Sequence, residues 1–292
     1  MVESKRGRVY FILLLFFYLL AVVLAFNPIK RLLSDPRIDL FYTHIPIVPI
    51  ITIFLLFGKR KALFSAPAPA TLPGILIASA GLTFYLLSRF SDLMDEYSIS
   101  LAVFSAITFW AGTYLAFYGF KSFKLAIFPI GFLLFAVPLP PSIMNWLVKE
   151  IAGSSVHITD IAFSLIRIPF VREGIEIYLP GYILVVGPEC AGWRSSIALV
   201  MISLLAGHLF IKEFKHKLLL AAVAIPMIII KNGIRIVVLY LIAYFIDERF
   251  MEGGFIHRSV GYGMFIVVLI IMGLLLWQLE KKETRQQSSG QP

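Results

Sequence analysis

The chain has a single cysteine, Cys190, which lies in the polar stretch Gly-Pro-Glu-Cys-Ala-Gly-Trp-Arg-Ser-Ser at the start of a long apolar run. If a helix begins here, the thiol feels the positive end of the helix macrodipole, and Arg194 adds a cation one turn later. Both effects favour the thiolate, which is the nucleophilic form of cysteine. The alternative is a small buried side chain that packs between helices. Nucleophilic catalysis and structural packing are therefore both open for Cys190.

Two later apolar runs carry ionisable side chains at a matching depth. Position 235 is 18 residues beyond Lys217, about 27 Å along a continuous helix, which places Arg235 near the outer boundary of a membrane. His257 opens the last apolar run, about one membrane thickness before Glu280. Alone, Arg235 is explained by snorkelling to headgroups and His257 by an ordinary interfacial position. Together, three separate segments bring a thiol, a guanidinium and an imidazole to one depth.

The elements that carry these residues are membrane spans. Hydrophobic residues make up 59% of the 292 positions and charged residues 15%, which is too apolar for a soluble domain. A spanning helix needs roughly 20 apolar residues, so the sequence predicts an all-α polytopic membrane protein with about eight transmembrane helices. We expect one domain over 1–292 with a catalytic core at about 138–280. The predicted spans are 9–26, 43–57, 70–87, 99–117, 125–137, 191–211, 218–246 and 260–279.

The distribution of cations predicts how the chain lies in the membrane. Lysines and arginines gather at both termini and in every second loop, at 5–8, 59–61, 121–124, 212–217 and 281–285. By the positive-inside rule these segments face the cytosol, so both termini are cytosolic and the candidate site is extracytoplasmic. The net charge of +9 then reflects topology and contact with the lipid bilayer rather than nucleic acid, because the cations share no single surface.

One long segment outside the spans, about 138–189, leads to Cys190 and is expected on the outer side. Its first part, 143–168, has apolar residues at helical spacing and predicts an amphipathic helix at the membrane interface. Its second part, 171–186, has Gly174, Pro180 and Gly181 around two apolar stretches. This pattern predicts a short β-hairpin between helices five and six, which delivers the chain to Cys190.

Three motifs follow one another along the last three predicted spans. They are Glu-Cys-Ala-Gly-Trp-Arg-Ser-Ser from position 189, Asn232-x-x-Arg235, and His257-x-x-x-Gly261. In this order and spacing the chain resembles the exosortase/archaeosortase family of membrane-embedded cysteine transpeptidases. The resemblance implies that Cys190 is the nucleophile, Arg235 the essential arginine and His257 the third catalytic residue. Supporting or substrate-binding positions are Glu189, Arg194, Asn232 and Arg258, and Arg258 competes with His257 for the third role.

The resemblance also implies a substrate and a reaction. Substrates would be secreted proteins whose C-terminal sorting signal has a short motif, a hydrophobic helix and a basic tail. Cys190 would attack a peptide carbonyl at the outer membrane face, while His257 transfers the proton and Arg235 stabilises the oxyanion. The acceptor that resolves the thioester, a lipid, a glycan or water, stays open. An extended substrate could pair with the edge of the hairpin. No cofactor is expected, and no metal, because the histidines lack metal-ligand spacing.

Two interpretations from other classes remain. A transporter or channel would use Glu189, Lys231 and Arg235 to line a polar path, but it should show paired discontinuous helices in two related halves, and the sequence has no such internal repeat. A non-catalytic membrane assembly protein would keep Cys190 for packing alone. Full function in a Cys190→Ala variant, together with slow labelling of the thiol, would favour the assembly protein.

Overall fold

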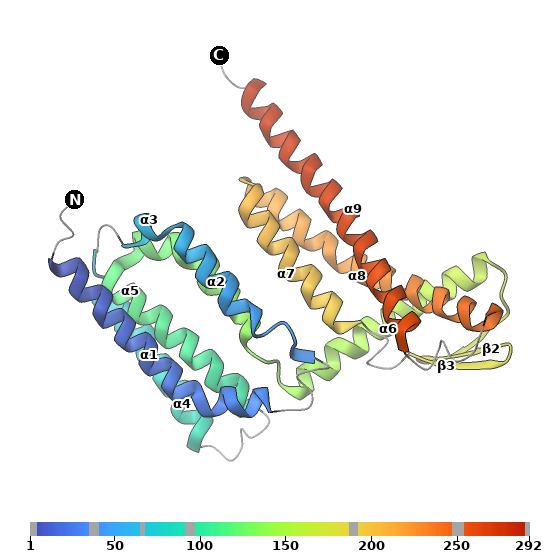
Figure 1. Ribbon diagram of the computed structural model, residues 1–292, viewed down its shortest axis with the longest axis horizontal. Helices are drawn as coiled ribbons and strands as arrows, with labels where there is room; N and C mark the ends of the chain where they lie inside the picture. Colours follow the sequence, from blue (N-terminus) through green and yellow to red (C-terminus); the bar gives the residue numbers. More distant parts are fainter. Residues whose placement is uncertain are drawn as a thin grey trace. The chain divides into compact units, whose positions relative to one another are not determined.

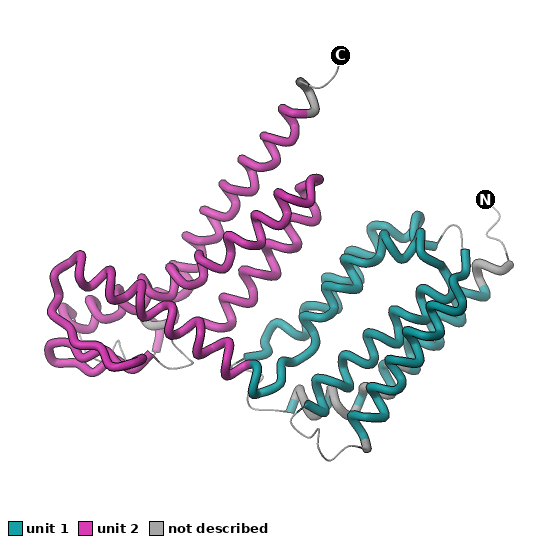
Figure 2. The backbone as a smooth tube through the Cα atoms, turned by 180° about the vertical axis from the view of Figure 1, so that it is seen from behind, with its two compact units in different colours: residues 1–143 teal, residues 144–292 magenta. Residues whose placement is uncertain are grey.

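The computed structural model describes residues 5–34, 41–64, 68–90, 97–186, 192–246 and 254–289. Cys190 and Glu189 lie outside these ranges, and for His257 the backbone is described but not the side chain. The chain forms two compact units, Met1–Ile143 and Met144–Pro292, which are coloured separately in Figure 2. The second unit begins close to the expected start of the catalytic core and contains all three motifs.

The first unit is a bundle of helices in which small residues allow close contact. Gly74 and Gly112 lie where α4 and α5 meet, and an added methyl group at either would collide with backbone of the other helix. Such small-residue contacts are typical of helices that pack in membranes. The elements are α1 (Lys5–Leu33), α2 (Ile47–Gly58), α3 (Arg60–Phe64), α4 (Thr71–Phe90), α5 (Ser98–Phe132) and the 3₁₀ helix η3 (Leu133–Ala136) (Figure 1).

Helix α5 contains a break that separates two of the predicted spans. Gly119 has φ 73° and ψ −179°, which is non-helical backbone within the element. A side chain at this position would collide with the carbonyl oxygen of Ala68. Glycine is therefore required both by the backbone angle and by the close approach. The predicted spans 99–117 and 125–137 lie on either side of this break.

The second unit holds a helical bundle and a small sheet. Helices α7, α8 and α9 pack around a buried apolar core that includes Leu199, Leu220, Ile228 and Met272. Helix α8 has 32 residues and is therefore about 48 Å long, which exceeds the roughly 30 Å hydrocarbon thickness of a bilayer. The elements are α6 (Pro141–Leu165), β1 (Val171–Glu173), β2 (Glu176–Leu179), β3 (Tyr182–Val185), α7 (Trp193–Phe210), α8 (Phe214–Phe245) and α9 (Gly254–Ser289) (Figure 1).

Helix α6 confirms the helix predicted over 143–168. Its buried residues recur every three or four positions, from Met144 through Val148, Ala152 and Thr159 to Phe163, as expected of an amphipathic helix. The buried face packs on α8, where the Phe163 and Tyr240 rings meet edge to face with centroids 5.3 Å apart. Its place at the membrane interface stays a prediction.

The segment 171–186 forms a three-stranded antiparallel sheet in the order β1-β2-β3. The predicted hairpin is β2 and β3, joined at Pro180 and Gly181, with Tyr178 opposite Ile183. Strand β1 was not predicted as a separate strand, because Val-Arg-Glu is short and has no apolar alternation. It is added by a second tight turn at Gly174, whose φ of 64° suits glycine.

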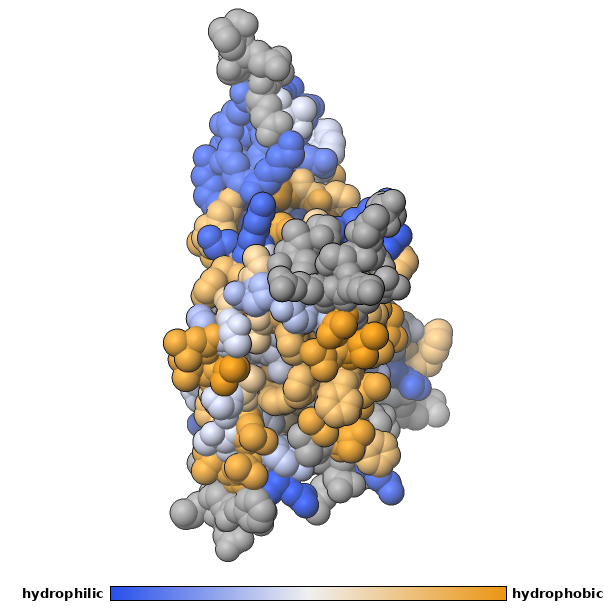
Figure 3. Space-filling model, turned by 90° about the vertical axis from the view of Figure 1, so that its left-hand side faces the viewer, coloured by the Kyte–Doolittle hydropathy of each residue, from blue (hydrophilic) through white to orange (hydrophobic). Residues whose placement is uncertain are grey.

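The described helices are those of a membrane protein. Five are long and apolar enough to cross a bilayer: Thr71–Arg89, Ser98–Ala136, Trp193–Phe210, Phe214–Phe245 and Gly254–Gln286. Helix α1 exposes Ile12, Phe16, Leu19 and Val23, each more than half accessible, and Figure 3 shows hydrophobic residues over much of the face it displays. So much exposed apolar surface is expected to face lipid. The number of eight spans stays a prediction.

Candidate active site

The first motif is held by an unusual turn at the start of α7. Gly192 has φ 60° and ψ 36°, a left-handed conformation, and the helix begins at Trp193. Side chains of Ser195 and Ser196 both donate hydrogen bonds to the Gly192 carbonyl oxygen, at 2.9 Å each. The sequence predicted that this helix starts at Ala191. Within the described residues it starts at Trp193. Left-handed backbone costs a residue with a Cβ about 1–2 kcal/mol, so glycine is the residue suited to this turn.

This turn removes the regular helix that was expected to place Arg194 beside the cysteine. The expected contact relied on regular helix from 190 to 194, but Gly192 interrupts the helical backbone between these positions. The side chain of Arg194 is exposed at the start of α7. A supporting role for Arg194 stays a prediction, without the helical geometry first assumed for it.

The second motif meets the first through Asn232. This side chain is fully buried on α8, and a methyl group added to Gly192 would lie 2.6 Å from its Oδ1 atom. Position 190 precedes Gly192 by two residues, and two peptide units span at most about 7 Å. The turn that begins two residues after the predicted nucleophile is therefore held against Asn232.

The third motif meets the second through Arg235. A methyl group added to Gly261 on α9 would lie 3.4 Å from Nε and 3.6 Å from Cζ of Arg235. His257 is four residues before Gly261 on the same helix, so both positions share one helical face. The arginine of the second motif thus lies against the helix face that carries the histidine of the third.

Arg258, the other candidate for the third role, is placed differently. Its side chain is exposed, and its Nε donates a hydrogen bond of 3.2 Å to the carbonyl oxygen of Gly254. That bond turns the guanidinium toward the beginning of its own helix. Positions 257 and 258 are respectively four and three residues before Gly261, so both border its face, and it is the direction of the Arg258 side chain that sets this residue apart.

The sheet that leads to Cys190 is fastened to two helices. Arg172 of β1 forms a 2.7 Å ion pair with Asp160 of α6 and a 3.0 Å hydrogen bond with Nδ1 of His157. On β3, the ring of Tyr182 packs edge to face on Tyr240 of α8, with centroids 6.3 Å apart. A long-range ion pair leaves no local signal in the sequence.

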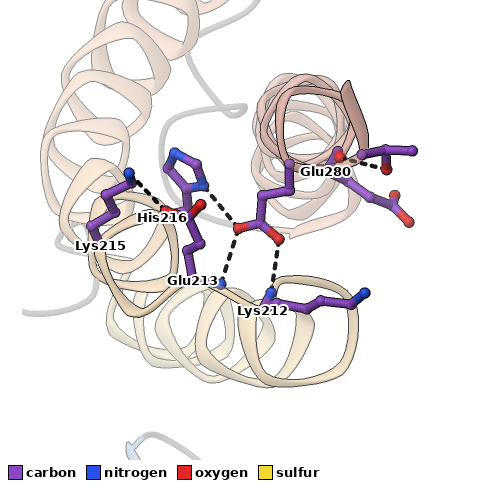
Figure 4. A network of polar contacts seen from close by, with 7 residues as sticks. Lys212, Glu213, Lys215, His216 and Glu280 are labelled. Carbon is purple, nitrogen blue, oxygen red and sulfur yellow. Dashed lines mark hydrogen bonds and ion pairs between the residues drawn. The ribbon is translucent and has the colours of Figure 1, made fainter. Parts of the chain in front are cut away.

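A second polar cluster pins the other end of the bundle. The buried carboxylate of Glu283 on α9 accepts hydrogen bonds from the backbone nitrogens of Lys212 and Glu213, at 2.9 and 3.1 Å, and lies 2.8 Å from Nδ1 of His216. Figure 4 shows Lys212, Glu213 and His216 gathered around this carboxylate. An anion is favourable at the N-terminus of α8, where backbone amides lack helical partners. The cluster therefore fixes the position of α9 along the axis of α8.

Replacing Glu283 by alanine is expected to destabilise the second unit by about 2 kcal/mol, because three donors at a buried site lose a charged acceptor. Thermal unfolding in detergent micelles measures the change. Glu280→Ala, on an exposed position of the same helix, is the matched control and should melt as the wild type does. Equal melting temperatures for the two variants would contradict a stabilising role for the cluster.

The apolar helices and the outward-facing hydrophobic surface define a multi-pass helical membrane protein. Within that class, the chain belongs to the transmembrane exosortase family, whose model matches residues 38–274. The match runs from before α2 into α9 and includes all three motifs. No curated protein and no solved structure matches the chain. Members of the family are generally sorting transpeptidases that act on protein substrates in the membrane.

Proposed function

We propose that this protein is a cysteine transpeptidase that removes the C-terminal sorting signal of secreted proteins at the outer face of the cell membrane. The observation that carries the proposal is the meeting of three distant segments. Gly192 lies so close to Asn232 that an added methyl group would collide with it, and a methyl group at Gly261 would lie in van der Waals contact with Arg235. The first contact joins the turn before α7 to α8, and the second joins α8 to α9. Family membership supports the reaction class.

The reaction proceeds by acyl transfer. The Cys190 thiolate attacks the scissile carbonyl carbon, the peptide C–N bond breaks, and a thioester forms between enzyme and substrate. His257 donates a proton to the departing amine, and Arg235 stabilises the oxyanion of the tetrahedral intermediate. The acceptor nucleophile then attacks the thioester, and the thiolate leaves. A fixed donor at the oxyanion contributes about 3 kcal/mol, which corresponds to a factor of about 10² in the rate of acyl transfer.

His257 rather than Arg258 takes the third role. The positions of His257 and Gly261 share the face of α9 that Arg235 approaches, with a methyl group at Gly261 only 3.4 Å from Nε. The Arg258 side chain donates to the Gly254 carbonyl oxygen instead. A guanidinium that is engaged with its own helix end and exposed is poorly placed to donate a proton to a substrate.

The test of the proposed function is processing of a tailed substrate. The chain is co-expressed with secreted proteins from the same genome that end in a shared motif, a hydrophobic helix and a basic tail. The expected result is a shorter product that depends on the enzyme. Mass spectrometry of its new C-terminus separates transfer to a lipid or glycan from hydrolysis by water. If no tailed protein is shortened, the proposed function is wrong.

The substrate strand pairs with the outer edge of β3. The nitrogen of Val186 donates to the Ile175 carbonyl oxygen at 3.0 Å, and bonded and non-bonded pairs alternate along antiparallel strands. With Tyr178 opposite Ile183 in the adjoining pair, the backbone groups of Ile183 and Val185 therefore point away from β2. Their side chains are 63% and 52% exposed. An extended peptide can add to such an edge, and the chain continues from this strand to Cys190.

Ile183→Asp should weaken processing about tenfold by raising the substrate concentration needed for half-maximal rate, because a charge at a strand edge opposes strand addition. The measurement is the rate of processing at several substrate concentrations in proteoliposomes. Val171→Asp is the matched control, since Val171 is equally exposed, at 63%, on the opposite edge of the sheet. A similar loss in both variants would argue against pairing at β3.

A further inference from the structure

Lys231 is a charged side chain in the interior of the second unit. It lies on α8, four residues before Arg235, and only 3% of its surface is accessible. A buried ammonium loses its hydration and is retained only where protein groups or a bound anion compensate. The three motifs do not include Lys231, and the proposed acyl-transfer mechanism assigns no role to it.

The ammonium is directed at the turn that follows the cysteine. Nζ of Lys231 donates a hydrogen bond to Oγ of Ser195 on α7, and Ser195 Oγ donates in turn to the Gly192 carbonyl oxygen at 2.9 Å. The chain of bonds runs from α8 to the left-handed residue two positions after Cys190. The ring of Phe265 on α9 lies 6.0 Å from Nζ, at the limit of a cation–π contact.

Both of these partners are uncharged. A hydroxyl and an aromatic ring compensate part of the desolvation of an ammonium, but neither supplies a negative charge. The described charged and titratable side chains nearest to Lys231 along each packed helix are Arg235 on α8, Arg194 on α7, Arg258 and Tyr262 on α9, and on α6 Lys149, Glu150, His157 and Asp160, the last two of which contact Arg172. Cations dominate this set, so the interior beside the turn favours an anion.

We propose that Lys231 is a positioning residue for the nucleophile: held by Ser195, its ammonium fixes the turn at Gly192 and keeps Cys190 as the thiolate. The inference rests on the proposed function, in which Cys190 is the nucleophile. Position 190 is tethered within about 7 Å of Gly192. At about 10 Å and an effective dielectric constant near 20, one cation changes the midpoint of thiol ionisation by about one pH unit. The proton released by the thiol passes to solvent water.

The test uses Cys190 itself as the probe, because it is the only cysteine in the chain. The full-length protein in detergent micelles is alkylated with iodoacetamide over a range of pH, and intact mass gives the rate at each pH. Lys231→Met removes the charge and keeps much of the side-chain length. It should move the midpoint of the rate profile up by about one pH unit. Lys231→Arg retains the charge and should restore most of the shift.

A matched control separates the local charge from the net charge of the protein. Lys215→Met makes the same change on the same helix, at an exposed residue that pairs with Glu213 at 2.7 Å. Positions 215 and 231 are about 24 Å apart along α8, beyond the range of effective interaction at ordinary salt. The midpoint in Lys215→Met should equal that of the wild type.

The outcomes are distinct. An unchanged midpoint in folded Lys231→Met overturns the inference. If that variant does not fold, Ser195→Ala is the deciding variant, because it removes only one oxygen atom and releases the ammonium from its hydrogen bond. The midpoint of its rate profile should rise by about half a pH unit. An unshifted midpoint in Ser195→Ala overturns the inference. A wild-type midpoint near 8.5, the value of a free cysteine, would instead count against the activated thiol of the proposed function.

Discussion

Cys190→Ala is expected to abolish processing of a tailed substrate, with the rate falling at least about 10⁴-fold, because no other group in the mechanism forms the acyl intermediate. The measurement is the appearance of the shortened product in membranes that contain equal amounts of enzyme and variant. Uncleaved substrate should accumulate in the membrane. A stable complex of substrate with the variant is also expected, since binding does not require the thiol.

The control for this substitution is a second loss of a small polar group in the same bundle. Ser203→Ala on α7 removes a buried hydroxyl that donates only to the Leu199 carbonyl oxygen within its own helix, at 2.7 Å. It should process substrate as the wild type does. Labelling of intact cells with a membrane-impermeant thiol reagent tests on which side of the membrane Cys190 lies. Labelling is expected, because such a reagent modifies only thiols at the outer face. Cleavage that persists in Cys190→Ala would refute the assignment of the nucleophile.

Arg235→Gln is expected to lower the rate of processing by about 10²–10³ with little change in substrate binding, as found when one oxyanion donor is removed. Arg235→Lys should recover only part of the loss, because an ammonium lacks the planar pair of donors of a guanidinium. The measurement is the rate at saturating substrate in proteoliposomes. A loss expressed only as weaker binding would mean that Arg235 holds the substrate and does not stabilise the transition state.

Two further variants test the geometry around this arginine. Arg258→Gln removes a neighbouring exposed guanidinium and should change the rate less than about threefold, as surface substitutions usually do little. Gly261→Val places bulk where a single methyl group would already lie 3.4 Å from Nε of Arg235, so it should displace the guanidinium and reduce the rate while Arg235 is still present. Equal losses of rate in Arg258→Gln and Arg235→Gln would contradict the assignment of the third catalytic role to His257 and would favour Arg258.

Helices were the most predictable part of the fold. Long apolar stretches such as Phe214–Phe245 are helical in the structure, because backbone groups in a membrane must be bonded internally and a helix achieves this within one segment. The amphipathic pattern over 143–168 likewise corresponds to α6. The ends of helices were less predictable. Helix α7 starts only after Gly192, because this residue adopts a left-handed conformation. A hydropathy pattern contains no information about a single backbone angle.

The candidate catalytic residues could be singled out from the sequence, but their relative placement could not be predicted. Cys190, Arg235 and His257 stood out because polar groups are costly in an apolar run. Lys231 carries the same signal, and yet its partner Ser195 is 36 positions away in the sequence. The ion pair of Arg172 with Asp160 and the contact of Asn232 with Gly192 also join separate elements. Such pairs follow from which helix faces meet, and one sequence does not contain that information.

By itself, the sequence determined that this protein is a helical membrane protein with one thiol, and its ordered motifs indicated the exosortase family. These features depend on residue type and on spacing within single segments. The tertiary structure decided that Lys231 reaches the turn after Cys190 and that Arg235 lies against Gly261. It also added strand β1 to the sheet. Contacts between helices depend on how their surfaces fit, and small residues such as Gly192 and Gly261 set that fit only when both partners are in place.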